Sequence, residues 1–284
     1  MQQDISIRIL TSNDLAVADR IVTSAFGLPE SRASEIHRYL RLKPNCWFLA
    51  SYREQPAGVV GATNYGPFAY LGMMTVRKEL QRKGIGRTLL EHMLSWTEEN
   101  GISCLRLDAS PAGYPLYLQF GFEVLDGSLL FQLPDYSPFS NYPQQVRPLS
   151  LENVRALADF DTPIFGADRS GLFQVLLTDF PNRAYAVYDE SGSMAGYLFA
   201  QSRRLGPWAA RSLEDAEALL QAALTLNFNG SPLVIAPKMN RAALNLLERF
   251  GFRLELTNHH MQRGGSVIPG QRTAVYGITS FAIG

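Results

Sequence analysis

Three short segments in the first half of the chain recur, in the same order, in the second half. The matching pairs are residues 7–10 with 146–149, 55–62 with 193–200, and 120–124 with 250–254, at offsets of 139, 138 and 130 residues. Each copy of a repeat forms the same elements in the same order, so this feature restricts the possible folds more than any single motif does. The sequence therefore predicts two related domains.

The boundary between the two predicted domains lies in residues 134–144. This stretch contains three prolines together with serine, asparagine and aspartate, which favour turns and interrupt any regular period. We therefore expect a first domain over residues 1–133, a linker over 134–144 and a second domain over 145–284. A chain of 284 residues is long enough for two domains of ordinary size.

The charges of the chain balance, because lysine plus arginine and aspartate plus glutamate both number 26. A chain without net charge has no global field to attract nucleic acid or an anionic membrane, so we expect neither partner, and any anion site must be local. The first ten residues alternate like a strand and lack the pattern of a secretory leader, and no apolar run is long enough to span a bilayer. We therefore expect a cytoplasmic protein.

The two cysteines and the histidine pair do not indicate a metal site. Cys46 and Cys104 each lie in an apolar stretch, where small buried thiols are common, so we expect both to be free and buried. Neither has the spacing of a zinc site, and the pair His259–His260 has no cysteine or carboxylate cluster near it in sequence. We expect no metal.

Short strand-like runs in the first copy give way to a helical pattern after residue 84. Residues 46–52, 58–64 and 70–76 are strand-like and are separated by turn formers, which indicates an antiparallel meander. A helix is then expected from Ile85 to the C-cap signal at Asn100–Gly101, followed by a strand over 103–109. The last two strands with their helix form a βαβ unit, so we expect them to be parallel, with a ligand at their carboxyl ends.

The turn between this strand and helix is rich in glycine and in positive charge. Gly84 and Gly86 lack Cβ atoms, so the backbone can approach a phosphate, and the free N–H groups of the helix start point to the same place. Five cations surround the turn, against the single acid Glu79: Arg77, Lys78, Arg82, Lys83 and Arg87. The pattern favours an anion cradle over a solvated turn. A nucleotide is disfavoured, because the Gly-Lys-Ser/Thr ending of a P-loop is absent from this turn.

At this point the chain resembles the GNAT superfamily of N-acetyltransferases. Residues 81–86 (Gln-x-x-Gly-x-Gly) are similar to its acetyl-CoA pyrophosphate loop, and residues 116–122 (Leu-Tyr-x-x-x-Gly-Phe) to its second signature. With residues 161–169 and 205–208, the whole chain resembles tandem GNAT proteins with a degenerate second domain. The resemblance implies an α/β fold (an α+β mixed sheet) in which each domain has a mostly antiparallel sheet with a central parallel pair that splays apart.

The resemblance also implies a set of residues that bind acetyl-CoA as co-substrate. The backbone N–H of Met74 would contact the developing oxyanion, and Thr75 and Val76 would pair with the pantetheine arm. Ser110, where relatives often carry asparagine, would bind an amide of the cofactor. The pyrophosphate would be held by the loop and helix start, namely Gln81, Arg82, Lys83, Gly84, Ile85, Gly86, Arg87 and Thr88.

The same resemblance makes Tyr117 the general acid that protonates the leaving thiolate. The alternative is a helix tyrosine that only packs. The base is less defined, because residues 70–76 contain no carboxylate. Asp108 is the remaining candidate, and the alternative is that it caps the turn at residues 110–111. A water chain, or binding of an already neutral amine, would serve instead.

The second copy lacks several of these groups. Leu247 stands where Tyr117 stands in the first copy, and Asn240 matches Ser110. The place of the glycine loop falls near residues 211–216, which contain two acids and no glycine. Acids at a helix start repel a pyrophosphate, so we expect no productive CoA binding there.

Three charged residues of the second copy, Asp161, Asp168 and Arg169, have two interpretations. They either contact the acceptor or form an interdomain ion pair with helix caps.

We therefore expect an acetyl-CoA-dependent N-acetyltransferase whose acceptor is a primary amine of a small molecule or peptide. The amine would attack directly in a ternary complex, since no residue requires an acyl-enzyme. Residues 26–43 would form one wall of the acceptor site, with Glu30, Glu35 and His37 as candidates for holding the amine. The alternative is a CoA-binding sensor or scaffold without catalysis.

Overall fold

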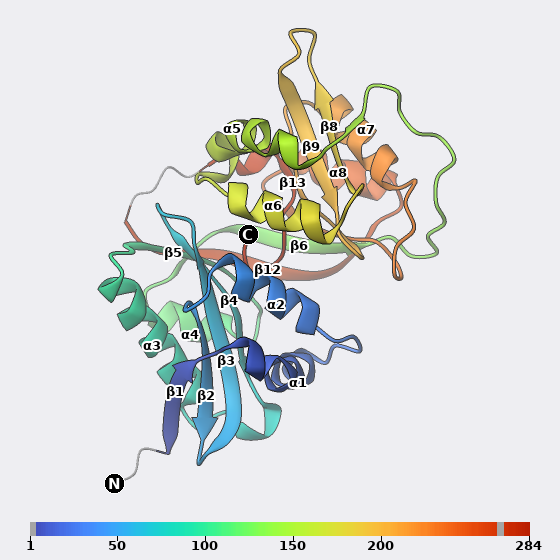
Figure 1. The fold of residues 1–284 in the computed structure, drawn as a ribbon. Coiled ribbons are helices and arrows are strands. Elements are labelled where there is room, and N and C mark those ends of the chain that lie inside the picture. The colour runs from blue at the N-terminus through green and yellow to red at the C-terminus, as the bar shows by residue number, and fades with distance from the viewer. Residues whose placement is uncertain (1–3, 266–269) are drawn as a thin grey trace. The chain divides into compact units, whose positions relative to one another are not determined.

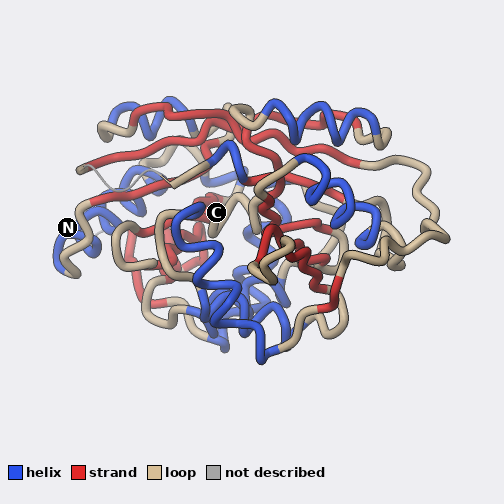
Figure 2. Tube along the Cα trace, turned by 90° about the horizontal axis from the view of Figure 1, so that it is seen from above, coloured by secondary structure: helices blue, strands red, loops and turns tan. Residues whose placement is uncertain are grey.

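The computed structural model describes residues 4–265 and 270–284, and packing divides them into two compact units (Figure 1). The first unit holds residues 4–107, 263–265 and 283, and the second holds the other described residues. In both units helices pack on the faces of the strands (Figure 2). Among the described residues, no helix is long and apolar enough to cross a membrane.

The sheet of the first unit runs in chain order. Its strands are β1 (Ile5–Ile9), β2 (Trp47–Tyr52), β3 (Gln55–Asn64), β4 (Ala69–Val76) and β5 (Cys104–Ala109), and the last two residues of β5 count with the second unit. Neighbours are antiparallel up to β4, and β4 pairs in parallel with β5, as the βαβ pattern predicts. The helices are α1 (Leu15–Phe26), α2 (Ala33–Leu42) and α3 (Ile85–Glu99).

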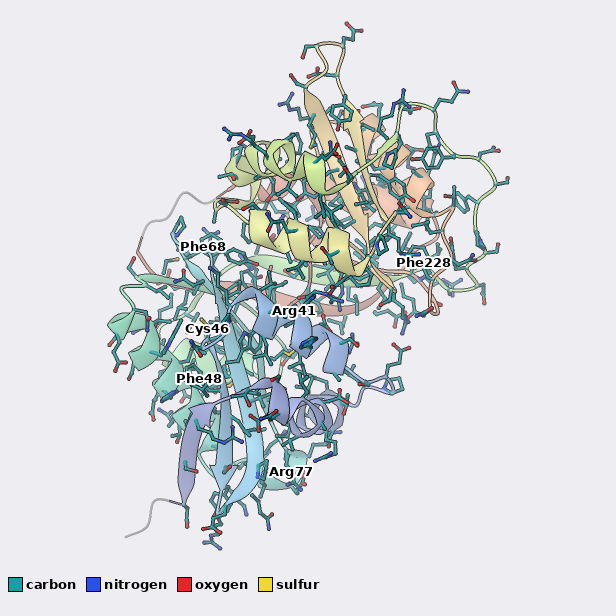
Figure 3. The ribbon with its side chains drawn as sticks, in the orientation of Figure 1. Arg41, Cys46, Phe48, Phe68, Arg77 and Phe228 are labelled. Carbon is teal, nitrogen blue, oxygen red and sulfur yellow. The ribbon has the colours of Figure 1, made fainter. Side chains whose placement is uncertain are left out.

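Aromatic packing fixes the middle of this sheet. The indole of Trp47 stacks on Tyr39 of α2, with ring centroids 5.5 Å apart. A Cβ on Gly61 of β3 would lie 1.9 Å from the Trp47 ring, so only glycine fits there. Cys46 and Cys104 are free and buried, as expected. Figure 3 labels Cys46 and Phe48 by β2, and it shows Phe68 and Arg77 at opposite ends of β4.

The second unit contains the remaining elements. Its helices are α4 (Tyr114–Gln119), α5 (Val154–Phe165), α6 (Ser170–Asp179), α7 (Leu213–Ala223) and α8 (Arg241–Arg249). Its strands are β6 (Glu123–Gln132), β7 (Arg147–Pro148), β8 (Ala184–Tyr188), β9 (Met194–Ala200), β10 (Arg204–Ala210), β11 (Leu233–Pro237), β12 (Arg253–Gly264) and β13 (Val275–Gly277). The sheet order is β7-β8-β9-β10-β11-β6-β12, with β13 also paired to β10. The parallel pair here is β10 with β11.

Strand β6 belongs to the first copy by sequence but lies between two strands of the second. Leu130 of β6 is opposite Ile235 of β11, and Leu129 is opposite Thr257 of β12, both in antiparallel pairs. Leu129 and Phe131 are part of the second unit's buried core. The two packing units are therefore not identical to the two sequence repeats. The linker at residues 134–144 stays a prediction of where one repeat ends and the next begins.

The fold class predicted from the sequence is confirmed. Each unit has a mixed sheet that is mostly antiparallel and contains one parallel pair, β4 with β5 and β10 with β11. The order of strands and helices from β7 to β12 follows that from β1 to β6, as the repeat predicts.

A buried ion pair joins the two helices α5 and α6 of the second unit. Arg169 donates from Nε and Nη2 to the two carboxylate oxygens of Asp161 at 2.6 and 2.9 Å, and Tyr197 donates to Asp161 Oδ1 at 2.5 Å. Both charged side chains are at most 2% exposed. The pair therefore lies within one unit, so the expectation of an interdomain pair was wrong, and burial leaves neither side chain at the surface. Asp168 accepts from the Ser170 N–H at 2.7 Å at the first residue of α6, although the N-cap position itself is Arg169.

We predict that Arg169→Met lowers the free energy of unfolding by about 3–5 kcal/mol, because it leaves the Asp161 carboxylate buried without its cation. Urea denaturation followed by circular dichroism measures the change. Arg155→Ala is the matched control, since Arg155 and Asp159 on α5 form an exposed pair 3.9 Å apart, and we expect it to cost about 0.5 kcal/mol or less. Equal effects of the two variants would contradict a structural role for the buried pair.

Candidate functional site

Strands β4 and β5 pair over only three residues. The pairs are Ala69 with Leu105, Tyr70 with Arg106 and Leu71 with Leu107. Beyond Gly72 the register with β3 slips, and Met73 has a φ of +52°, so a bulge turns the strand at this point. No strand among the described residues covers the β5 side of residues 72–76.

The residues predicted to contact the reacting end of the cofactor lie on this uncovered segment. Met74 and Val76 are half-buried, and Thr75 is buried with its hydroxyl donating to the Met73 carbonyl at 3.2 Å. An uncovered strand edge offers backbone N–H and C=O groups to a ligand as it would to another strand. The segment can therefore bind an extended arm that carries amide groups.

The glycine-rich turn leads directly into α3. Gly84 is the N-cap residue with a φ of +83°, a conformation that glycine adopts without strain. The first helical bond runs from the Thr88 N–H to the Gly84 carbonyl at 2.9 Å, so the N–H groups of residues 85–87 precede it. A Cβ built on Gly84 would meet nothing within 4 Å, so the space before the helix start is open. This arrangement fits a phosphate group.

Side chains around the glycine-rich turn hold its conformation and leave positive charge at the surface. Gln81 donates from Nε2 to the Val76 carbonyl at 3.2 Å, which ties the turn to the end of β4. Arg77 pairs with Glu79, whereas Arg82 and Lys83 are exposed and have no acidic partner among the described residues. The excess charge makes the field at the helix start positive, as an anion site requires.

Tyr117 lies in α4 of the second unit and is 6% exposed. Its ring packs edge-on against Phe122, with centroids 5.5 Å apart. Burial raises the pKa of the phenol well above its usual value, so the hydroxyl stays protonated at any physiological pH. The hydroxyl has no hydrogen-bond partner among the described residues, so it is available to donate. Ser110 accepts from the Gly113 N–H at 3.3 Å and so caps the turn before α4.

Asp108 follows Leu107, the last residue of β5 that pairs with β4, and its side chain is fully buried. Ser128 donates to Asp108 Oδ1 at 2.6 Å, and His260 Nδ1 lies 3.3 Å from the same oxygen. Burial by itself raises the pKa of Asp108, but the contacts with His260, Arg272 and Ser128 outweigh it and hold the pKa below its usual range. These contacts, rather than a cap at residues 110–111, are what the structure shows for this carboxylate.

The partners of Asp108 were not predicted from the sequence. His260 lies 152 residues further along the chain, and Arg272 reaches the cluster through Asp126 at 3.0 Å and Ser128 at 3.2 Å. The neighbouring His259 stacks on Tyr114, with ring centroids 4.3 Å apart. The described residues contain no group of three or more histidine, cysteine or acidic side chains that is arranged to hold a metal ion.

We predict that Asp108→Asn lowers the melting temperature at pH 7 and that the deficit persists down to about pH 4 and shrinks as the pH falls further. The pKa of Asp108 is lower in the folded chain than in the unfolded one, so its stabilisation is present above the unfolded pKa of about 3.9 and is lost as the carboxylate is protonated. Differential scanning fluorimetry between pH 7 and about 2.5 measures this, with the exposed Asp159→Asn as control. A deficit independent of pH would contradict the ionised state.

In residues 26–43, which are expected to form one wall of the acceptor site, one of the candidate groups for holding the amine already has partners. Glu35 of α2 accepts from the Tyr39 hydroxyl at 2.6 Å and pairs with Arg32 at 3.3 Å. This carboxylate therefore has a structural role in holding α2, whatever else it contacts.

The second unit differs at the positions equivalent to the glycine turn and to Tyr117. The N-cap of its helix α7 is Ser212, whose side chain accepts from the Asp215 N–H at 3.0 Å, so a side chain caps the helix start that is open in α3. Glu214 and Asp215 occupy the first turn. Leu247 is fully buried in the core. These differences agree with the expected loss of an anion site in this copy.

Comparison with known proteins identifies the family. Residues 16–122 match the family model described as acetyltransferase (GNAT) family, and residues 157–277 match one described as acetyltransferase (GNAT) domain. The chain belongs to the GNAT family of acetyltransferases. Both halves of this GNAT acetyltransferase match a GNAT family model, so the predicted tandem organisation is confirmed.

Individual relatives support this assignment. The chain is 26% identical over 198 residues to the "Uncharacterized N-acetyltransferase YitH" of Bacillus subtilis (strain 168), covering 68% of this chain and 69% of that protein. A putative acetyltransferase from Pyrococcus horikoshii is 26% identical, with a TM-score of 0.88 over 100% of this chain and 97% of its own. A GCN5-related N-acetyltransferase from Sphaerobacter thermophilus, at 14% identity and a TM-score of 0.71 over 95% and 99% of the two chains, shares the fold.

Proposed function

We propose that this GNAT acetyltransferase transfers the acetyl group of acetyl-CoA to a primary amine of a small molecule or peptide, by direct attack in a ternary complex. The observation that carries the proposal is the first unit's combination of an uncovered strand edge at residues 72–76 with an open, positively charged start of α3. Two such features, joined by the Gln81 contact to Val76, suit a ligand with an amide-bearing arm and a pyrophosphate.

The proposed binding residues divide into two groups. Thr75 and Val76, with Ser110, would hold the amide-bearing arm through backbone and hydroxyl groups. The phosphates would be held by the residues around the helix start: Gln81, Arg82, Lys83, Gly84, Ile85, Gly86, Arg87 and Thr88. The bound thioester supplies an activated acetyl group.

Three residues are proposed for the chemistry. The backbone N–H of Met74 would donate to the oxygen that becomes negative as the amine attacks. Tyr117 would donate its proton to the sulfur that leaves. The raised pKa of Tyr117 keeps that proton on the phenol until it is needed.

Asp108 is proposed to take the proton of the attacking amine, directly or through water. Its pKa is held low, so the carboxylate is ionised and able to accept. The hydrogen bond from Ser128 and the contact with His260 fix its orientation. Since the carboxylate is buried, a water molecule or the His260 imidazole would complete the path from the amine.

The alternative function is a CoA-binding sensor or scaffold without turnover. Such a protein needs the loop of residues 81–88 but has no need for a protonated, unpartnered tyrosine hydroxyl. The buried Tyr117 therefore favours the enzyme.

We predict that Tyr117→Phe lowers kcat by about 10²- to 10⁴-fold, because the leaving thiolate loses its proton donor. Release of free thiol from acetyl-CoA in the presence of a panel of amines measures kcat, and calorimetry measures the affinity for acetyl-CoA. We expect that affinity to stay within about twofold.

Tyr114→Phe is the matched control, because Tyr114 starts the same helix and stacks on His259. It should retain most of the activity. Equal losses of kcat and acetyl-CoA affinity in Tyr117→Phe would show that the tyrosine only packs. Wild-type chain that binds acetyl-CoA but acetylates none of the amines would favour the sensor.

A further inference from the structure

The parallel strands of the second unit also separate after a short contact. Strands β10 and β11 pair only at Arg204 with Leu233 and Leu205 with Val234. In this unit, however, β10 has a third neighbour. The short strand β13 pairs antiparallel with it at Trp208 with Gly277 and at Ala209 with Val275.

Strand β13 and the residues after it contact both sides of the opening. The Ile278 N–H donates to the Ile235 carbonyl of β11 at 2.8 Å, while Gly277 and Val275 face β10. Asn240, the N-cap of α8, donates from Nδ2 to the Val275 carbonyl at 2.9 Å. The segment 275–278 therefore lies between the diverging strands, in the position that corresponds to the uncovered edge of β4 in the first unit.

The fit between this segment and β10 is close. A Cβ on Gly277 would lie 2.8 Å from the Leu205 carbonyl oxygen, which is a backbone atom and cannot rotate away. Gly206, with a φ of +152°, would place a Cβ 2.2 Å from the Ile278 carbonyl oxygen. Both glycines permit backbone-to-backbone contact that a side chain would prevent.

Two segments of the second copy that carry the resemblance to tandem GNAT proteins, residues 161–169 and 205–208, both contact segment 275–279. Arg169, from residues 161–169, donates to the Thr279 hydroxyl at 3.3 Å while it pairs with Asp161. Gly206, from residues 205–208, permits the contact just described. Gln201 donates from Nε2 to the Gly206 carbonyl at 2.7 Å and to the Thr279 carbonyl at 3.1 Å. The charged and polar groups that are conspicuous in this copy therefore secure segment 275–279.

We propose that segment 275–279 is a built-in ligand of the second unit. Its backbone occupies the opening between β10 and β11 and satisfies the strand edge that, in the first unit, is proposed to bind the amide-bearing arm of acetyl-CoA. The second unit is thereby complete without cofactor, and acetyl-CoA does not displace the segment. The inference goes beyond the proposed function, because it concerns the copy to which no activity is assigned.

Hydrogen–deuterium exchange of the full-length chain, with and without saturating acetyl-CoA, tests this proposal. We expect slow exchange in residues 275–279 and in residues 208–210 without ligand, unchanged when acetyl-CoA is added. Faster exchange in 275–279 on adding acetyl-CoA would overturn the proposal, because it would mean that the cofactor competes for the opening. Unchanged exchange in residues 81–88 would count against the proposed function alone.

Gly277→Ala is expected to speed exchange in both segments on the order of tenfold, because the new methyl group forces β13 away from β10. Strand β8, residues 184–188, should keep its slow exchange. The matched control is Gly171→Ala in α6, where a Cβ meets nothing within 4 Å, and it should leave 275–279 unchanged.

Asn240→Ser tests the same point with a milder change. Serine still caps the Ala243 N–H, as asparagine does at 3.0 Å, but it loses the donor to the Val275 carbonyl. It should speed exchange in 275–279 and leave residues 241–249 protected. If both variants exchange like the control, segment 275–279 does not depend on these contacts and the proposal fails.

Discussion

Parallel strands that diverge leave backbone N–H and C=O groups without a strand partner, and buried backbone groups of this kind must be satisfied. Both units contain this constraint, since β4 and β5 pair over three residues and β10 and β11 over two. In the second unit the chain itself supplies the partner, β13. In the first unit no described strand does so, and the open edge is where the co-substrate is proposed to bind. Much of the difference between the two copies follows from how this one opening is filled.

The starts of helices α3 and α7 differ as the strand edges do: the first unit's helix start is open, and the second unit's is capped by its own residues. In the first unit Gly84 leaves the N–H groups of α3 accessible, and cations surround them. In the second, Ser212 caps α7 and two acids occupy its first turn, so the helix dipole is satisfied internally. A unit that meets its own hydrogen-bonding needs gains stability without ligand but has no open site. The second copy thus serves as part of the scaffold: its strands β11 and β12 pair with β6 of the first copy.

The sequence was sufficient to predict the structure wherever the contacts that determine it are local. The strand, glycine turn and helix of residues 70–99 follow from hydrophobic period, glycine and cap signals that act within a few residues. The sequence repeat likewise predicted the second copy's elements. It was insufficient where contacts join distant segments: nothing near Asp108 indicates that His260 would lie beside it. The same holds for β6, whose alternation fits a strand in either copy, and for β13, which is three residues long. The interdomain ion pair expected for Asp161 failed for this reason too, because charge alone does not identify a partner.

The two related copies differ in that one keeps an uncovered strand edge and the other has filled it. Calorimetric titration of the full-length chain with acetyl-CoA tests this most directly, using the wild type, Gly84→Glu and Leu213→Glu. The two variants place an acid at the start of α3 and of α7, respectively. We expect one site per chain, lost in Gly84→Glu and retained in Leu213→Glu. Two sites in the wild type, or one site that survives Gly84→Glu, would contradict it.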